Sequence, residues 1–151
     1  LRDAQRKTLS LERTGMAITL DIGEEKDIHP ANKQDVGLRL ARLALHYDYG
    51  QKDLVPTGPL YKSQILHPNY SDLSFDHIGS GLWGKNNLSG FEIAASEGGF
   101  VPAKAIIIGD QIRVSSKKVK NPKRVRYGWK NFFDATLFNP EGLPGSSFDT
   151  P

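Results

Sequence analysis

Cysteine is absent from the 151 residues, and histidine occurs only four times. The lack of cysteine excludes disulfide bridges, thiolate catalysis and cysteine-based zinc sites. The histidines are His29, His46, His67 and His77, and none of them stands in an H-x-x-x-H or H-E-x-x-H string of the kind that supplies zinc ligands. We therefore predict no metal site, and nothing in the chain indicates a cofactor.

Long hydrophobic runs and a strong excess of one charge are also missing. No stretch of about 18 apolar residues occurs, so the sequence predicts no membrane-spanning segment. The formal net charge is only +3. Eight basic residues and no acid stand between Arg113 and Lys130, but alternation with Val125, Tyr127 and Trp129 is typical of a solvent-facing strand side. We predict no nucleic-acid partner, because no RNA- or DNA-binding signature accompanies this run.

Residues 1–50 show helical and strand periodicity in turn. Residues 1–14 have the spacing of a short amphipathic helix, and the apolar run from Met16 to Leu20 predicts a buried strand of an α/β sheet, ended by Asp21. From residue 31 a second helix is predicted. Its apolar stripe is Val36, Leu40, Leu43, Ala44 and Tyr47, with Lys33, Gln34, Arg39 and Arg42 on the opposite side. Without further strands, we expect Ile18, Leu20, Leu40 and Leu43 to face solvent, the following domain or another chain.

The loop between the predicted strand and helix, IGEEKDIHP at 22–30, carries His29. Sites of α/β proteins gather at the carboxyl ends of strands, which is where this loop lies. His29 can act as a general base oriented by a carboxylate, either Asp27 or Asp21. Alternatively, the His-Pro pair only shapes the loop and the loop acids are solvated. The residues alone leave both interpretations open.

Residues 58–151 show the pattern of an antiparallel β-sandwich. Helical periodicity ends at Tyr49, and the polar connector QKDLVPTG at 51–58 predicts a domain boundary between Gly50 and Gly58. The predicted strands are 60–66, 73–78, 91–95, 103–108, 111–115 and 124–129, with a two-residue turn at 109–110. The predicted inner face includes Phe75, Phe91, Ile93, Ile107, Ile112, Val114, Tyr127 and Trp129.

The string GMAITLDIGEEKDIHPANKQDVGLRLARLAL resembles the last catalytic block of the sialate O-acetylesterase family, which are SGNH/GDSL-type carbohydrate esterases. Further strings resemble the family in the same order: GPLYKSQ at 58–64, FDHIGSGL at 75–82, LSGFEIA at 88–94, IIIGDQIRVSS at 106–116, VRYGW at 125–129 and LFNPEGLPGSSF at 137–148. The resemblance implies a mixed fold. Residues 1–50 would be the terminal strand and helices of an SGNH α/β hydrolase domain, and residues 58–151 an accessory β-sandwich.

In that family a serine attacks an acetyl ester, the histidine of the IHP string is the general base, and a nearby aspartate orients it. His29 matches this histidine. The acid commonly stands three residues earlier, but position 26 is Lys, so Asp27 and Asp21 are the candidates and we favour Asp27. The implied substrate is an acetylated carbohydrate, and the implied location is secreted, periplasmic or lysosomal. The alternative is a non-catalytic β-sandwich module that binds sugar.

The chain contains no GDS-like or G-x-S-x-G string for a nucleophile. Ser80 and Ser146 stand in the strings HIGSGL and PGSSF, which lack that pattern, so we predict structural roles for both. The family's serine and oxyanion-hole residues belong to blocks upstream of residue 1. We therefore interpret the chain as the C-terminal part of a larger esterase, and the N-terminal part with the nucleophilic Ser is the expected partner.

This interpretation predicts that the 151-residue chain alone has no measurable turnover on p-nitrophenyl acetate, because both nucleophile and oxyanion donors are missing. The measurement is release of p-nitrophenolate over the buffer rate. Turnover that disappears in His29→Ala would refute the interpretation.

Overall fold

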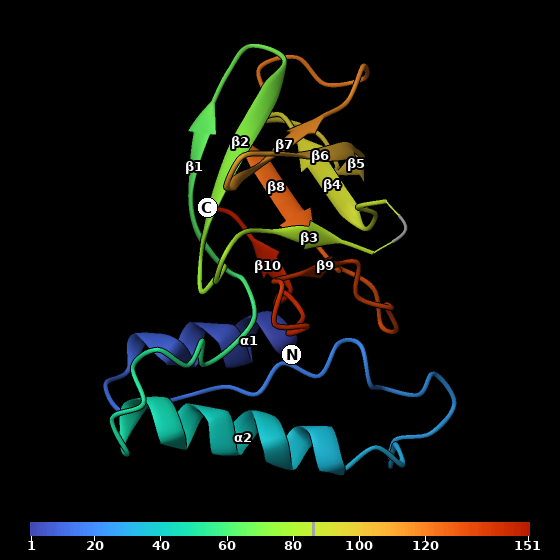
Figure 1. Ribbon diagram of the computed structural model, residues 1–151. Helices are drawn as coiled ribbons and strands as arrows, with labels where there is room; N and C mark the ends of the chain where they lie inside the picture. Colours follow the sequence, from blue (N-terminus) through green and yellow to red (C-terminus); the bar gives the residue numbers. More distant parts are fainter. Residues whose placement is uncertain (86) are drawn as a thin grey trace.

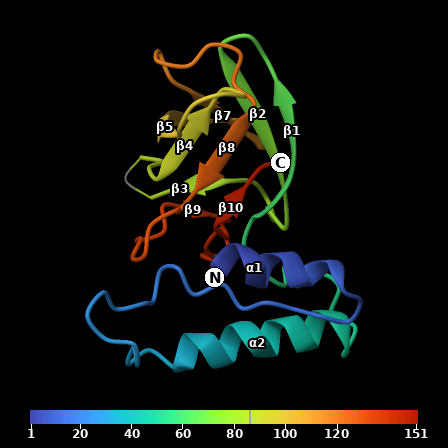
Figure 2. The same cartoon turned by 180° about the vertical axis from the view of Figure 1, so that it is seen from behind.

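Two short helical segments lie on one side of a β-sandwich (Figure 1). The structure is a computed structural model, and it describes residues 1–85 and 87–151. Helix α1 spans Arg2–Lys7, the 3-10 turn η1 spans Thr8–Ser10, and α2 spans Gln34–Tyr47. Both views show the segment that precedes α2 running between α1 and α2 (Figure 1 and Figure 2). Helix α1 confirms the helix that was predicted in residues 1–14.

Short antiparallel strands make up the rest of the described chain. One four-stranded sheet has the order β1-β2-β7-β6, a second has the order β10-β8-β4-β5, and β3 pairs with β9. The strands are β1 Leu60–Leu66, β2 Tyr70–Asp76, β3 Trp83–Gly84, β4 Phe91–Ala94, β5 Val101–Pro102, β6 Lys104–Ile108, β7 Gln111–Ser115, β8 Arg124–Tyr127, β9 Leu137–Phe138 and β10 Phe148–Asp149. The prediction of an antiparallel β-sandwich is confirmed, and so is the turn at 109–110 between β6 and β7.

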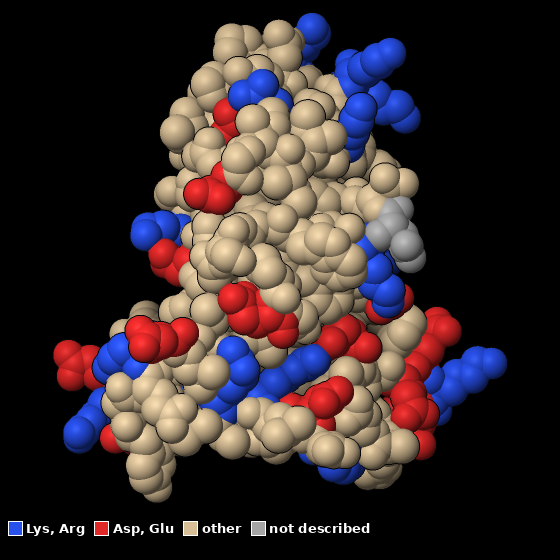
Figure 3. Space-filling view, viewed as in Figure 1, with Lys and Arg blue, Asp and Glu red and all other residues tan. Residues whose placement is uncertain are grey.

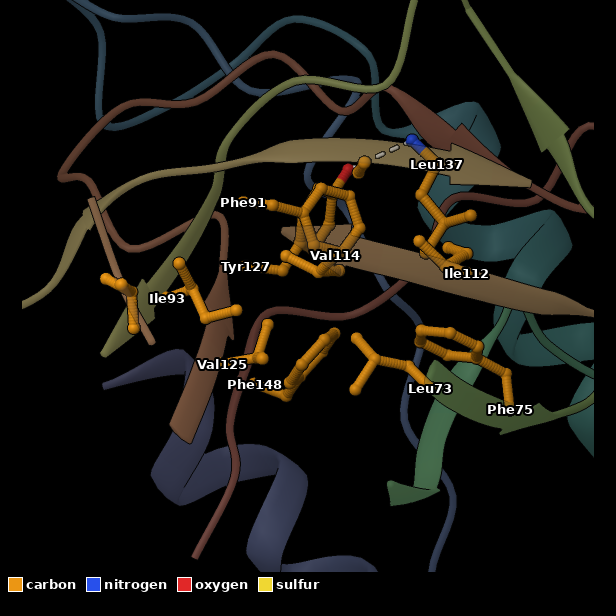
Figure 4. Close-up of a cluster of buried hydrophobic side chains, with 12 residues drawn as sticks. Leu73, Phe75, Phe91, Ile93, Ile112, Val114, Val125, Tyr127, Leu137 and Phe148 are labelled. Carbon is orange, nitrogen blue, oxygen red and sulfur yellow. Dashed lines mark hydrogen bonds between the residues drawn. The ribbon is translucent and has the colours of Figure 1, made fainter. Parts of the chain in front are cut away.

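The core lies between the two larger sheets, because alternate residues of each strand point inward. Figure 4 shows these side chains meeting from both sheets. Of the predicted inner residues, Ile107 is partly buried and packs against the core. The fully or nearly fully buried predicted residues are Phe75, Phe91, Ile93, Ile112, Val114 and Tyr127, and they are joined by Leu73, Val125, Leu137 and Phe148.

Aromatic rings fill the centre of this core. The ring of Phe148 in β10 lies 5.0 Å from that of Tyr61 and 5.8 Å from that of Phe75, measured between centroids. The Tyr127 hydroxyl oxygen accepts hydrogen bonds from the backbone amides of Thr136 and Leu137, each at 3.0 Å. Burial raises the pKa of Tyr127. The hydroxyl therefore ties the segment before β9 to the core without leaving a buried polar group unpaired.

Trp129 does not belong to the core, contrary to prediction. Strand β8 ends at Tyr127, and Gly128 takes a φ of +62°, a conformation that strands do not use. The amide of Gly128 donates to the carbonyl of Gly90 at 3.0 Å. The alternation of inward and outward residues stops there, and 39% of Trp129 is exposed.

The run from Met16 to Leu20 is not a strand in this structure. No strand of the described residues pairs with it, and a strand of a sheet requires at least one hydrogen-bonded neighbour. Ile18 is nevertheless buried, and it lines a narrow gap with Arg39 of α2 and Pro144 of the sandwich. Of the surroundings that the sequence left open for Ile18, the structure shows the side facing Pro144, and Leu20 is partly buried.

Helix α2 buries only part of the face that was predicted to point inward. Leu43 is buried, but Leu40 and Tyr47 are exposed, and Arg39 is buried in their place. The guanidinium of Arg39 is drawn inward by the carboxylate of Asp21. Two of the five residues of the predicted apolar stripe are therefore exposed.

The second half of the connector 51–58 is more buried than its polar composition predicts. Pro56, Thr57 and Gly58 are buried, and a Cβ on Gly58 would stand 1.9 Å from the carbonyl oxygen of Pro144. The buried Asn139 amide nitrogen donates to the carbonyls of Thr57 at 3.1 Å and His77 at 3.0 Å. The second half of the connector is therefore part of the sandwich.

The division into residues 1–50 and 58–151 stays a prediction, and the structure sharpens its test. Residues 49–53 are exposed, whereas residues 56–59 are buried. We expect limited subtilisin digestion to cut first within 49–53 and to leave the β-sandwich intact, because proteases cleave exposed backbone. Mass spectrometry of the fragments gives the sites. Uniform resistance of the whole chain would instead indicate one inseparable domain.

Candidate active site

The loop that carries His29 is held by its own acidic side chains. A carboxylate oxygen of Glu24 accepts a hydrogen bond from the amide of Ala31 at 2.8 Å, and the amide of Asp27 donates to the carbonyl of Glu24 at 3.4 Å. Past the loop, Asn32 Oδ1 accepts from the amide of Asp35 at 3.1 Å, in the first turn of α2. These local bonds keep the loop close to the start of the helix.

His29 lies beside Asp27 at the surface. Its backbone amide donates to Asp27 Oδ1 at 2.8 Å, and its ring Nδ1 stands 3.9 Å from the same oxygen. That second separation is too long for a hydrogen bond. The His29 side chain is 82% exposed and that of Asp27 is 55% exposed. The structure thus brings these two predicted site residues together, with one side of the imidazole open.

Asp21 is engaged elsewhere. Its two carboxylate oxygens each accept from a separate nitrogen of the Arg39 guanidinium, both at 2.7 Å. Arg39 also donates to the carbonyl of Ile18 at 2.5 Å. A bidentate pair of this kind fixes both partners, so the carboxylate of Asp21 holds α2 to the segment before the His29 loop. No local pattern predicts this pair, because its members are 18 residues apart.

A cleft of about 360 Å³ lies next to the His29 loop. Asp27 and Ile28 line it from the loop, and Phe132 lines it from the segment after β8. Acidic side chains gather over the loop on the face seen in Figure 3. The cleft is therefore bordered by the carboxylates of Glu24 and Asp27 and by apolar side chains such as Ile28 and Phe132. This combination is typical of small-molecule sites.

Neither Ser80 nor Ser146 is placed as a nucleophile. Ser146 is buried, and its hydroxyl donates to the carbonyl of Ser147 at 3.1 Å. Ser80 is exposed in the turn between β2 and β3. Over residues 1–85 and 87–151 no cluster of three or more histidine or acidic side chains is arranged to hold a metal. In the same residues no helix has the length and apolar character needed to cross a membrane.

Part of the basic run between Arg113 and Lys130 is paired with acids. Arg113 donates to both carboxylate oxygens of Asp72, at 2.8 and 2.9 Å, and this lowers the pKa of Asp72. Arg126 donates to Glu92 at 2.8 Å. These two arginines have partners across the strands of their own sheets.

The chain is similar to a carbohydrate acetylesterase from Xanthomonas citri whose crystal structure is known. The two are 44% identical in sequence with a TM-score of 0.93, and the match covers 100% of this chain and 35% of that chain. The chain thus spans about a third of the length of that protein. No family model matches the sequence, and no curated protein matches it.

The Asp21 and Arg39 pair predicts a stability effect. Both side chains are largely buried, 15% and 11% exposed, so Asp21→Asn would leave the Arg39 charge without its partner. We expect a loss of about 2 to 4 kcal/mol in the free energy of unfolding, measured by urea denaturation of the chain.

The matched control is Asp76→Asn, which removes an equally short pair with Lys62 at 2.7 Å. Those side chains are 48% and 59% exposed, so the expected loss is below about 1 kcal/mol. Equal losses in both variants would show that burial of the Asp21 pair is unimportant.

Proposed function

We propose that this chain is the C-terminal part of a carbohydrate O-acetylesterase of the sialate type, acting through a Ser-His-Asp mechanism. The observation that carries the proposal is 44% identity, along the entire chain, to a carbohydrate acetylesterase. The match includes both the His29 loop and the sandwich, because it covers 100% of this chain. The serine is proposed to lie in the part of the enzyme outside this chain.

In the proposed reaction, the serine hydroxyl attacks the acetyl carbonyl while His29 takes its proton. His29 then gives that proton to the sugar oxygen, which leaves as an alcohol, and the acetyl group stays on the serine. Water next attacks the acetyl-serine, with His29 again as base, and acetate is released. Nδ1 faces Asp27, so Nε2 is the ring atom that exchanges protons in this scheme.

Asp27 is the proposed orienting acid. Its Oδ1 is already fixed by the His29 amide and lies 3.9 Å from Nδ1, and such contacts tighten when a complete site binds its substrate. Asp21 is the weaker candidate, because both of its oxygens are bound to Arg39.

The proposed partner is the N-terminal part of the same enzyme. Leu38, Leu40 and Tyr47 of α2 are exposed. Parallel strands with helices on both faces are the arrangement that would cover these groups. The unmatched 65% of the acetylesterase leaves room for such a domain in that protein, and we propose an equivalent here.

The test is the effect of His29→Ala on acetate release by the full-length enzyme. We expect kcat to fall by about a thousandfold or more, because the serine loses its base. Asp27→Asn should lower kcat less than His29→Ala does, but more than Asp21→Asn does.

His67→Ala is the matched control, because His67 is stacked on Tyr70 in the sandwich. This substitution should leave kcat unchanged. If Asp21→Asn is more damaging than Asp27→Asn in a folded protein, the orienting role moves to Asp21. An enzyme that binds acetylated glycans without releasing acetate would favour the non-catalytic sugar-binding alternative.

A further inference from the structure

The cleft beside the His29 loop is built by parts of the chain that are far apart in sequence, and the run from Met16 to Leu20 is one of them. Asp27 and Ile28 come from the loop, Arg2 comes from α1, and Asn131 and Phe132 come from the segment that follows β8. Figures 1 and 2 both show this sandwich segment descending toward the His29 loop. The sandwich therefore supplies one wall of the cleft that Asp27 borders, whereas the His29 side chain lies beside this cleft and does not line it.

The backbone just before Phe132 is held in place by Arg2. The guanidinium donates to the carbonyls of Gly128 at 2.7 Å and Asn131 at 3.1 Å, and also to the carbonyl of Lys130. It further donates to the hydroxyl of Ser147 at 3.1 Å. Several bonds from one planar group leave this segment little freedom to move.

Phe133 fixes the segment from the other side. Its ring packs edge-on against Tyr127, with 5.3 Å between centroids, and partly enters the core. The backbone of Gly90 lies directly under that ring, where a Cβ would stand 2.2 Å from it. The backbone of Phe132 is thus held on one side by the packed ring of Phe133 and on the other by the contacts of Arg2. Phe132 itself is 41% exposed and lines the cleft.

The chemistry of the cleft suits a sugar ring. A pyranose has C–H groups on its faces, which pack on apolar and aromatic side chains, and hydroxyl groups on its rim, which bond to carboxylates and amides. Phe132 and Ile28 offer the first kind of contact, and Asp27 and Asn131 the second. A volume of about 360 Å³ is also far more than an acetyl group requires.

We infer that Phe132 is a specificity-determining residue that contacts the carbohydrate part of the substrate, so that the sandwich forms part of the substrate site. This inference rests on the proposed esterase function. It assigns Phe132 no part in the chemistry of the ester bond, only in binding the sugar that bears it.

The test compares two acetyl esters with the full-length enzyme. Glucose pentaacetate carries a sugar ring, and p-nitrophenyl acetate does not. Phe132→Ala should raise KM for glucose pentaacetate by about tenfold, as expected for loss of one aromatic contact, and leave kcat/KM for p-nitrophenyl acetate unchanged. Phe132→Tyr keeps the ring and should retain the original KM.

Trp83→Ala is the matched control, because Trp83 is also an exposed aromatic residue of the sandwich but does not line the cleft. It should leave both substrates unaffected. Unchanged KM for glucose pentaacetate in Phe132→Ala would overturn the inference, as would an equal loss on both substrates, which indicates a structural role.

The two proposals fail in different ways. A wild-type enzyme without activity on either ester removes the esterase function itself, and a fully active His29→Ala variant removes His29 as the proposed base. An enzyme that hydrolyses p-nitrophenyl acetate but not glucose pentaacetate keeps an esterase function and overturns the sugar contact of Phe132.

Discussion

The guanidinium of Arg2 joins the helical part of the chain to the sandwich. Strand β8 ends at Tyr127, so the carbonyls of the residues that follow have no ladder partners, and Arg2 supplies donors to three of them. Helix α1 has only six residues and would be marginal in isolation. The contact therefore stabilises both the short helix and the turn, and it fixes where the segment around Phe132 lies.

A second attachment lies at the connector between α2 and β1. The amide of Asn139 binds the carbonyls of Thr57 and His77, and the backbone of Gly58 lies against Pro144. Arg42 of α2 also donates to the carbonyl of Val55 at 2.8 Å. With attachments at both the start and the end of the helical part, the His29 loop has a defined position relative to the sandwich.

Local pattern was enough to predict most of the sandwich. Strands β1 and β7 begin and end at the predicted residues, because two-residue alternation and turn residues mark both ends. Strands β3, β5, β9 and β10 have two residues each and depend on distant partners, so no local pattern marks them.

The orientation of α2 could not be predicted in the same way. Periodicity identifies the apolar residues of a helix, but it does not say which neighbour covers them. Arg39 turned inward because Asp21, a residue of another segment, offered a buried carboxylate. At the candidate site, the proximity of His29 and Asp27 follows from two-residue spacing, whereas Phe132 reaches the same cleft only through the tertiary fold.

The place of Phe148 in the core has a consequence for synthesis of the protein on the ribosome. Its ring packs with Tyr61, Phe75, Phe91 and Tyr127, so the core includes a side chain that is translated after all four. Thr150 adds a reciprocal pair of hydrogen bonds with Val125, both at 2.9 Å. The earlier strands therefore emerge from the ribosome with an apolar face that β10 covers last, and such a face favours association with other chains until it is covered.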